Sequence, residues 1–156
     1  MKKTMIVASL LAFISTSAVA NGSVKVPLKE ANSIYKAAGF KKNSRGWKSE
    51  CGDLAIKTYK DLNGDGLKDA IVSEYGSTRC YGMTAEGYYV IQQKPAGVWK
   101  RVFQSQGIPN LKQTRSKQGW PDILNGGPGF CFGVFRWDGQ TYKLHRYEYE
   151  GKACEL

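Results

Sequence analysis

The segment from Asp61 to Asp69, DLNGDGLKD, holds the side chains of this sequence with the clearest capacity for chemistry. Oxygen-bearing side chains stand at its first, third, fifth and ninth positions, and a glycine at the sixth allows a sharp turn. Three acidic side chains on one tight loop repel one another unless a cation lies between them. The sequence therefore predicts one Ca²⁺ site, with the side chains of Asp61, Asn63, Asp65 and Asp69 and the main-chain carbonyl of Leu67 as ligands.

This loop differs from an EF-hand in two respects. Val72 occupies the twelfth position, where an EF-hand has a bidentate glutamate. The loop also continues into Ala70-Ile71-Val72, which is typical of a strand rather than a helix. Because Asp and Asn favour turns that their own backbone hydrogen bonds hold together, a metal-free Asx-rich turn is the alternative interpretation.

Four cysteines form the second set of reactive residues: Cys51, Cys80, Cys131 and Cys154. No two of them have the spacing C-x-x-C, and the sequence has a single histidine, His145, which argues against a zinc site or a thioredoxin-type centre. An even number of cysteines in an exported protein predicts two structural disulfides. Three pairings are compatible with the sequence.

Residues 1–20 have the pattern of a signal peptide. Two lysines precede an apolar run at 5–14, and Ala18-Val19-Ala20 has the small-x-small form of a signal-peptidase site. The apolar run is too short to span a membrane. We therefore expect the protein in the periplasm or secreted, with no membrane span and with a mature chain that starts at Asn21.

The positive net charge of the chain indicates which partners it could bind. The formal charge is +10, and removal of the two lysines of the signal peptide lowers it to +8. A basic exported protein can bind anionic lipid, acidic glycan or the carboxylate-lined cleft of another protein, although such charge also serves as a solubilising surface. The sequence has no recognition-helix or RNA-binding signature, so no nucleic-acid partner is expected.

One helix and a series of short strands must position these residues. Apolar residues at helical spacing between Pro27 and Gly39 predict a helix, so residues 21–49 comprise this helix and a basic connection. Residues 50–156 form a β region of the same domain, with the stretch from Gln104 to Trp120 as a long loop. Candidate strands are 54–59, 70–75, 88–92, 98–103, 130–137 and 142–149.

A weak internal repeat relates residues 69–99 to residues 122–142. Each unit begins with an aspartate before a short apolar strand and ends in an aromatic hairpin. Cys80 and Cys131 occupy similar places in the two units, which favours a Cys80–Cys131 bridge and leaves Cys51 to pair with Cys154. Sequence alone leaves the other pairings open.

The calcium-type loop and the strand after it resemble the FG-GAP and VCBS-like repeat families, whose blades carry the motif D-x-N-x-D-G-x-x-D. The resemblance covers residues 50–154, and the second unit lacks the acidic ligands before Asp122, so it implies only one calcium site. It implies a small exported bacterial protein that is mainly β, with one N-terminal helix and antiparallel sheets stacked as a partial propeller-like assembly. It implies no activity by itself.

No catalytic constellation is recognisable, so we expect a protein that is not an enzyme. The sequence has no G-x-S-x-G elbow, P-loop or H-E-x-x-H motif. His145 lies inside a candidate strand and is typical of a half-exposed sheet residue. The run Gly126-Gly127-Pro128-Gly129 is typical of a tight β connection, with an anion-binding nest as the alternative.

Two non-enzymatic functions are compatible with these features. The first is an inhibitor or immunity protein against a peptidoglycan hydrolase or another exported protein, a role known among calcium-loop β proteins of this kind. Arg79 and Tyr81, on a loop after the calcium-anchored strand, are its candidate binding residues, unless Tyr81 packs inward and Arg79 is only solvated. The second is a calcium-dependent surface or glycan-binding module, in which exposed Trp and Tyr stack on sugars.

Overall fold

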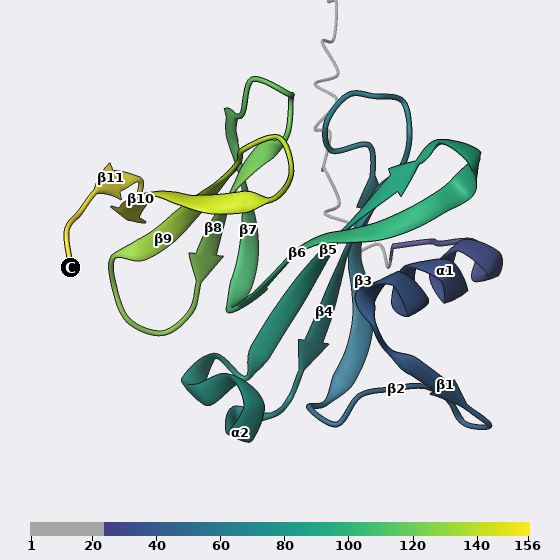
Figure 1. Cartoon of the computed structure of the whole chain (residues 1–156). Helices are drawn as coiled ribbons and strands as arrows, with labels where there is room; N and C mark the ends of the chain where they lie inside the picture. Colours follow the sequence, from purple (N-terminus) through teal and green to yellow (C-terminus); the bar gives the residue numbers. More distant parts are fainter. Residues whose placement is uncertain (1–23) are drawn as a thin grey trace, which may run out of the picture.

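The computed structural model describes residues 24–156, so the predicted signal peptide at 1–20 lies outside it. Antiparallel strands dominate, and the helix α1 (Leu28–Ala38) precedes them (Figure 1). The predicted fold class, mainly β with one N-terminal helix and antiparallel sheets, is confirmed. The strands are β1 (Lys41–Asn43), β2 (Gly46–Lys48), β3 (Asp53–Lys60), β4 (Asp69–Tyr75), β5 (Glu86–Lys94), β6 (Val98–Gln106), β7 (Ile108–Arg115), β8 (Pro121–Gly126), β9 (Phe132–Trp137), β10 (Tyr142–Tyr149) and β11 (Lys152–Ala153).

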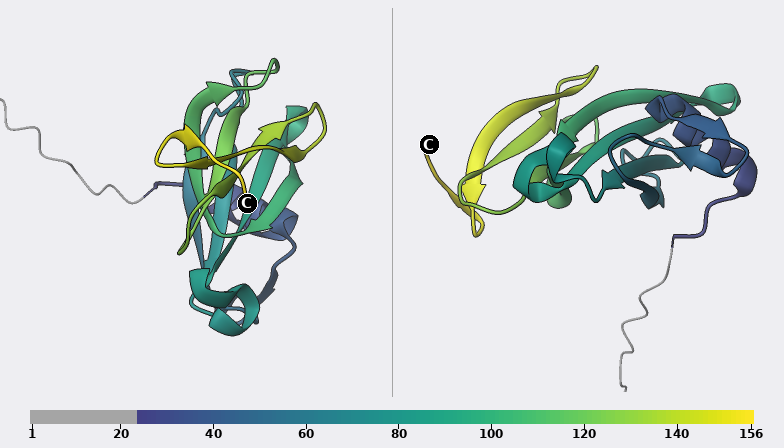
Figure 2. Two further views of the ribbon diagram at one scale, coloured as in Figure 1. Left: turned by 90° about the vertical axis from the view of Figure 1, so that its left-hand side faces the viewer. Right: turned by 90° about the horizontal axis from the view of Figure 1, so that it is seen from below.

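Two sheets form the body of the molecule. The first has the order β3-β4-β5-β6, the second has the order β11-β10-β9-β8-β7, and β1 and β2 form a separate ribbon. The second sheet and α1 lie toward opposite ends of the molecule (Figure 2). The short segments α2 (Thr78–Tyr81), η1 (Gly82–Thr84) and η2 (Pro95–Gly97) connect strands of the first sheet.

The helix α1 covers one face of the first sheet. The N–H of Gly39 donates to the carbonyl of Lys36 and ends the helix, as the sequence predicts. Ile34 and Ala38 of α1 are buried in a cluster with Ala70, Val72 and Ile91 of the sheet. Among residues 24–156, no helix is long and apolar enough to span a membrane.

The opposite face of the first sheet packs on the second sheet. The shared cluster includes Ile71, Val90 and Val102 from the first sheet, together with Trp120, Ile123, Trp137 and Tyr142. The rings of Trp120 and Trp137 stack with their centroids 4.9 Å apart. Because β4 and β5 carry apolar side chains on both faces, they form the centre of the fold, between α1 and the second sheet.

The predicted long loop from Gln104 to Trp120 is wrong, because β6 extends to Gln106 and β7 follows directly. The strand β7 lies at the edge of the second sheet, where a proline is tolerated and most side chains face solvent, so its sequence lacks apolar alternation. The chain changes sheets at Gly107, whose φ is +124°. A Cβ atom there would lie 2.5 Å from the side chain of Asn125, so only glycine fits.

The favoured disulfide pairing is also wrong, because the bridges are Cys51–Cys80 and Cys131–Cys154. Antiparallel pairing of β3 with β4 places the start of β3 beside the end of β4, where Cys51 and Cys80 lie. In the same way, β9, β10 and β11 bring Cys131 beside Cys154. Each bridge therefore closes within its own sheet instead of joining the two repeat units.

We expect non-reducing peptide mapping to recover these two bridges and no free thiol. Trypsin separates all four cysteines, because a Lys or Arg lies between each consecutive pair. Loss of the Cys51–Cys80 bridge should lower the free energy of unfolding by about 2–5 kcal/mol, as in other small disulfide-bonded domains. A tryptic peptide that joins Cys80 to Cys131 would contradict the structure.

Candidate functional site

The Asp61–Asp69 loop connects β3 to β4 at one end of the first sheet (Figure 1). The carboxylate of Asp61 accepts the N–H of Gly64 at 2.7 Å and the N–H of Gly66 at 2.9 Å. These backbone hydrogen bonds, above all the one from Gly66, lower the pKa of Asp61. Asp61 is therefore a fixed acceptor at the start of the loop.

The middle of the loop consists of interleaved Asx turns. The side chain of Asn63 accepts the N–H of Asp65 at 3.1 Å, and Asp65 accepts the N–H of Leu67 at 2.8 Å. The amide of Asn63 also donates to the second oxygen of Asp65 at 3.0 Å. The side chain of Asp65 is exposed, so one anionic group of the loop faces solvent.

Asp69 lies underneath the loop and is fully buried. Its two carboxylate oxygens accept the N–H groups of Leu62 at 3.1 Å and Gln93 at 3.2 Å. Burial raises the pKa of Asp69 to about 7, with a contribution from the charges of Asp65 and Asp61, although the two N–H groups act in the opposite direction.

The donor chemistry of this loop fits Ca²⁺, whereas its geometry is that of the Asx-rich turn. All the side-chain donors are oxygens, and an oxygen that accepts one N–H keeps a second lone pair for a cation. Within residues 24–156, however, no three His, Cys, Asp or Glu side chains converge as a metal-binding group would. Calcium binding at Asp61, Asn63, Asp65, Leu67 and Asp69 thus stays a prediction.

The turn between β7 and β8 supports the loop from outside. A guanidinium nitrogen of Arg115 donates to the carbonyl of Leu62 at 2.8 Å and to the carbonyl of Gly119 at 2.6 Å. This turn occupies the place of the loop in the second repeat unit, where the acidic residues are missing. It packs against the first loop instead of forming a site of its own.

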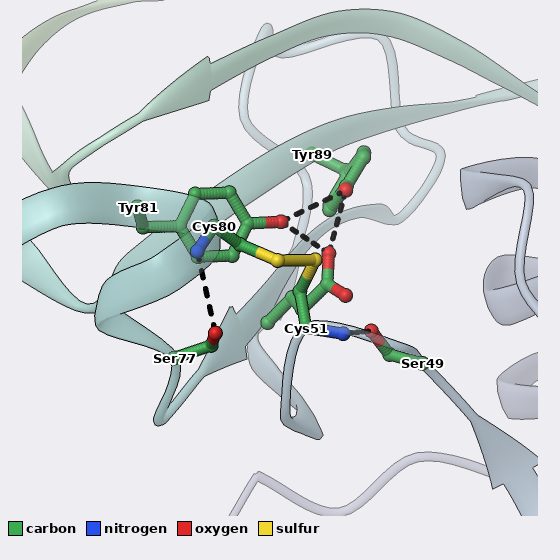
Figure 3. The surroundings of a disulfide bond; sticks show 7 residues. Ser49, Cys51, Ser77, Cys80, Tyr81 and Tyr89 are labelled. Atoms are coloured by element: carbon green, nitrogen blue, oxygen red, sulfur yellow. Dashed lines mark hydrogen bonds between the residues drawn. A yellow bond between two sulfur atoms is a disulfide. The ribbon is translucent and has the colours of Figure 1, made fainter.

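The segment Ser77–Thr84, hereafter the α2 projection, extends beyond β4 and β5 at the opposite end of the first sheet (Figure 1). The Cys51–Cys80 bridge ties it to the start of β3. The hydroxyl of Ser77 accepts the N–H of Cys80 at 3.3 Å and caps α2 (Figure 3). The N–H of Gly76 donates to the carbonyl of Ala85 at 2.8 Å, which closes the base of the projection.

Tyr81 packs inward, as the alternative interpretation of this residue had it. Its hydroxyl donates to the carboxylate of Glu74, which also accepts the hydroxyl of Tyr89 at 2.7 Å (Figure 3). Burial, with the bond to Glu74, raises the pKa of Tyr81 strongly. The ring of Tyr81 lies over Gly87, where a Cβ atom would be only 2.4 Å from it.

Arg79 lies on the exposed side of the α2 projection. Within residues 24–156 its side chain forms no ion pair, and its neighbour Met83 is 86% exposed. The structure therefore separates the two predicted binding residues, since Tyr81 holds the projection in place and Arg79 faces solvent.

Sequence reasoning missed an ion network on the outer face of the second sheet. The buried carboxylate of Asp122 accepts two hydrogen bonds from Arg136, at 2.8 and 2.7 Å, and one from Arg146 at 3.0 Å. Glu148 pairs with Arg146 at 2.6 Å and with Lys112 at 2.8 Å. These residues come from four strands, so no spacing along the chain reveals them.

Two other residues or segments that the sequence singles out lie apart from these sites. His145 is exposed at an irregularity of the β9–β10 pairing. Residues 127–131 connect β8 to β9, as expected for the glycine run.

Comparison of the chain with protein-family models, curated proteins and solved structures gave no match. The resemblance to FG-GAP and VCBS-like repeats therefore rests on the loop motif and the strands around it. The functional argument depends on the geometry described above.

The carboxyl group of Asp69 should titrate with a pKa of about 7 in metal-free protein. Because this folded-state value exceeds the ordinary value of 3.8, protonated Asp69 stabilises the fold. That contribution is complete below the ordinary pKa and disappears as the pH rises through about 7. Carboxyl ¹³C NMR in the presence of a chelator measures the pKa, and denaturant unfolding at each pH measures the loss of stability.

Asp138 provides an internal control in the same spectra. The N–H groups of Thr141 and Gln140 lower its pKa, so it should titrate below 3.8. An Asp69 carboxyl that titrates together with Asp138 would contradict the prediction.

Proposed function

We propose that the protein is an exported, non-catalytic inhibitor or immunity protein that binds a cell-wall hydrolase through the α2 projection. The observation that carries this proposal is the exposed Arg79, without an ion-pair partner among residues 24–156, on a segment that a disulfide, a helix cap and Tyr81 hold in place. Two disulfides are consistent with an extracellular or periplasmic location.

The α2 projection suits insertion into a cleft. A segment that is already ordered loses little conformational freedom on binding, so more of the contact energy contributes to affinity. A guanidinium forms strong, charge-assisted hydrogen bonds with a carboxylate. Glycosidases that cleave the cell wall carry a pair of catalytic carboxylates in their cleft, and Arg79 is a complementary group for them.

The positive charge of the chain supports the same kind of partner. A charge of +8 on the mature protein attracts an acidic cleft over several ångströms and increases the rate of encounter. Arg79 supplies the local contact, whereas the remaining charge acts at longer range.

We further propose that the Asp61–Asp69 loop holds one structural Ca²⁺. Asp61, Asn63, Asp65 and Asp69, with the carbonyl of Leu67, would supply oxygen ligands. The ion would offset the mutual repulsion of three carboxylates and stabilise the connection between β3 and β4. The loop and the α2 projection lie at opposite ends of β4, so the ion would act on the scaffold and not on the partner.

A glycan-binding module is the weaker alternative. Such a module presents flat aromatic faces to sugars, but Trp120 and Trp137 are buried and Trp47 and Trp99 are half-buried. Two tryptophans are therefore enclosed and the other two are only partly accessible for stacking, whereas Arg79 is exposed and fits an acidic protein cleft.

Calcium should raise the melting temperature of the protein relative to a chelator, because a ligand that binds only the folded state stabilises it. At a calcium concentration of about 100 times Kd, the gain in unfolding free energy is about 2.7 kcal/mol. Asp65→Ala should abolish the gain, whereas Asp53→Ala, an exposed acid outside the loop, should leave it unchanged. Identical melting curves in calcium and chelator would show that the loop is a metal-free turn.

Pull-down from a periplasmic extract with the wild-type protein should capture a peptidoglycan hydrolase, and equimolar protein should suppress its hydrolysis of cell-wall material. Arg79→Ala should then weaken binding by about 2 kcal/mol or more, as expected for a central arginine in an interface. Isothermal titration calorimetry measures the affinity, and the melting temperature should not change, because Arg79 is exposed.

Lys117→Ala is the matched control, since it removes one exposed positive charge from the turn between β7 and β8. It should reduce affinity only slightly. A captured hydrolase that remains fully active would refute inhibition, and equal effects of the two variants would exclude the α2 projection from the interface.

A further inference from the structure

An open pocket of about 500 Å³ lies between the C-terminal end of α1, the β1–β2 ribbon and the first sheet. Its volume falls within the range of small-molecule sites. Its lining includes three aromatic rings, two lysines, one deeply buried acid and one exposed acid: Phe40, Tyr81, Tyr89, Lys41, Lys48, Glu74 and Glu50.

Only one of the two carboxylate oxygens of Glu74 accepts hydrogen bonds from residues 24–156. Glu74 is 4% exposed, and one of its oxygens, Oε2, accepts the hydroxyls of both Tyr81 and Tyr89. In the part of the chain that the structure describes, Oε1 has no hydrogen-bond donor, although Glu74 lines the pocket. Oε1 is not fully enclosed by protein atoms, so within this pocket it can accept a hydrogen bond from a ligand donor such as an ammonium group.

The rim of the pocket has a net positive charge, because two lysines outweigh the exposed carboxylate of Glu50. Lys41 and Lys48 are directly opposed in the antiparallel β1–β2 pair, so they lie on the same side of the ribbon. Like charges in such a pair repel each other, and neither forms an ion pair within residues 24–156. An anionic group placed between them would remove this repulsion.

Aromatic side chains line the pocket between these charged groups, and contacts with neighbouring residues fix their positions. The rings of Phe40 and Tyr89 pack edge to face with their centroids 5.1 Å apart. Tyr81 is fixed by its hydrogen bond to Glu74 and by the Cys51–Cys80 bridge next to it (Figure 3). The pocket is thus preformed, with an apolar strip between an acidic floor and a basic rim.

We propose that this pocket binds a small zwitterion of the amino-acid or short-peptide class. The ammonium group of the ligand donates to Oε1 of Glu74, its carboxylate lies between Lys41 and Lys48, and its apolar part contacts Phe40 and Tyr89. This binding is independent of the α2 projection's exposed side, where Arg79 lies, and of any protein partner.

The proposal can be tested by NMR titration of the purified protein with alanine, dialanine and trialanine, which carry the same two charges at increasing separation. One of the three should shift the ring resonances of Tyr81 and Tyr89 in a saturable manner. Its N-acetyl and its amide derivatives each lack one charge and should bind at least about tenfold more weakly, because each loses a charge-assisted hydrogen bond.

Two sets of variants assign the charges to their partners. In Glu74→Gln the parent ligand and its N-acetyl derivative should bind equally, and in Lys41→Ala or Lys48→Ala the parent ligand and its amide should bind equally. Lys57→Ala, an exposed lysine of β3, should behave as wild type. Because Lys41 and Lys48 are exposed, their variants keep the test valid even if Glu74→Gln fails to fold.

Two results would overturn the proposal. One is the absence of a saturable shift with any of the three probes up to about 10 mM, where even a ligand of millimolar Kd is bound. The other is equal binding of the parent ligand and both of its derivatives to the wild-type protein. That result would show that neither the ammonium nor the carboxylate group of the ligand contributes to its affinity for the pocket.

Discussion

The burial of β4 and β5 on both faces is the constraint on which this fold depends. Ala70, Val72 and Ile91 face α1, while Ile71 and Val90 face the second sheet. A sheet that is apolar on both sides needs a layer on each side, because exposing either face would leave a large apolar area in water. The helix and the second sheet are therefore both required for the first sheet to be stable.

This arrangement places the polar groups of β4 at its two ends. Asp69 begins the strand beneath the calcium-type loop, and Glu74 lies near its other end beside the α2 projection. Each buried carboxylate needs donors, because an unsatisfied buried acceptor costs about 1–3 kcal/mol or more. Backbone N–H groups satisfy Asp69, whereas two tyrosine hydroxyls satisfy only one oxygen of Glu74. Backbone hydrogen bonds thus hold Asp69 beneath the loop, whereas the pocket keeps an accessible acceptor oxygen on Glu74.

On the second sheet, charged side chains cover the face that no other layer packs against. Its inner face packs on the first sheet, and Asp122, Arg136, Arg146 and Glu148 form a network on its outer face. Two arginines converge on one buried carboxylate, which would be costly to bury without cationic partners. Their guanidinium groups and aliphatic stems cover the outer face of the strands while the charged ends stay partly in water. The network thus replaces a third layer on this side.

The sequence by itself determined the elements with strong local signals. Apolar spacing from Leu28 to Ala38 and a glycine stop define α1, and alternation with Gly, Pro and Asp turns predicts most strands of both sheets. The loop motif located the Asx-rich turn, because its chemistry is contained in nine consecutive residues. An edge strand such as β7 escaped prediction, since edge positions need no apolar alternation.

Only the tertiary structure decided the features that join distant segments. Strand pairing placed Cys51 beside Cys80 and Cys131 beside Cys154, against the pairing that the repeat favoured. The structure also turned Tyr81 inward to Glu74 and left Arg79 exposed, although the two residues are neighbours in the chain. The pocket combines the residues that follow α1, the β1–β2 ribbon, β4, α2 and β5. Such sites depend on which strands lie side by side, and that is set by burial of the core rather than by any local pattern.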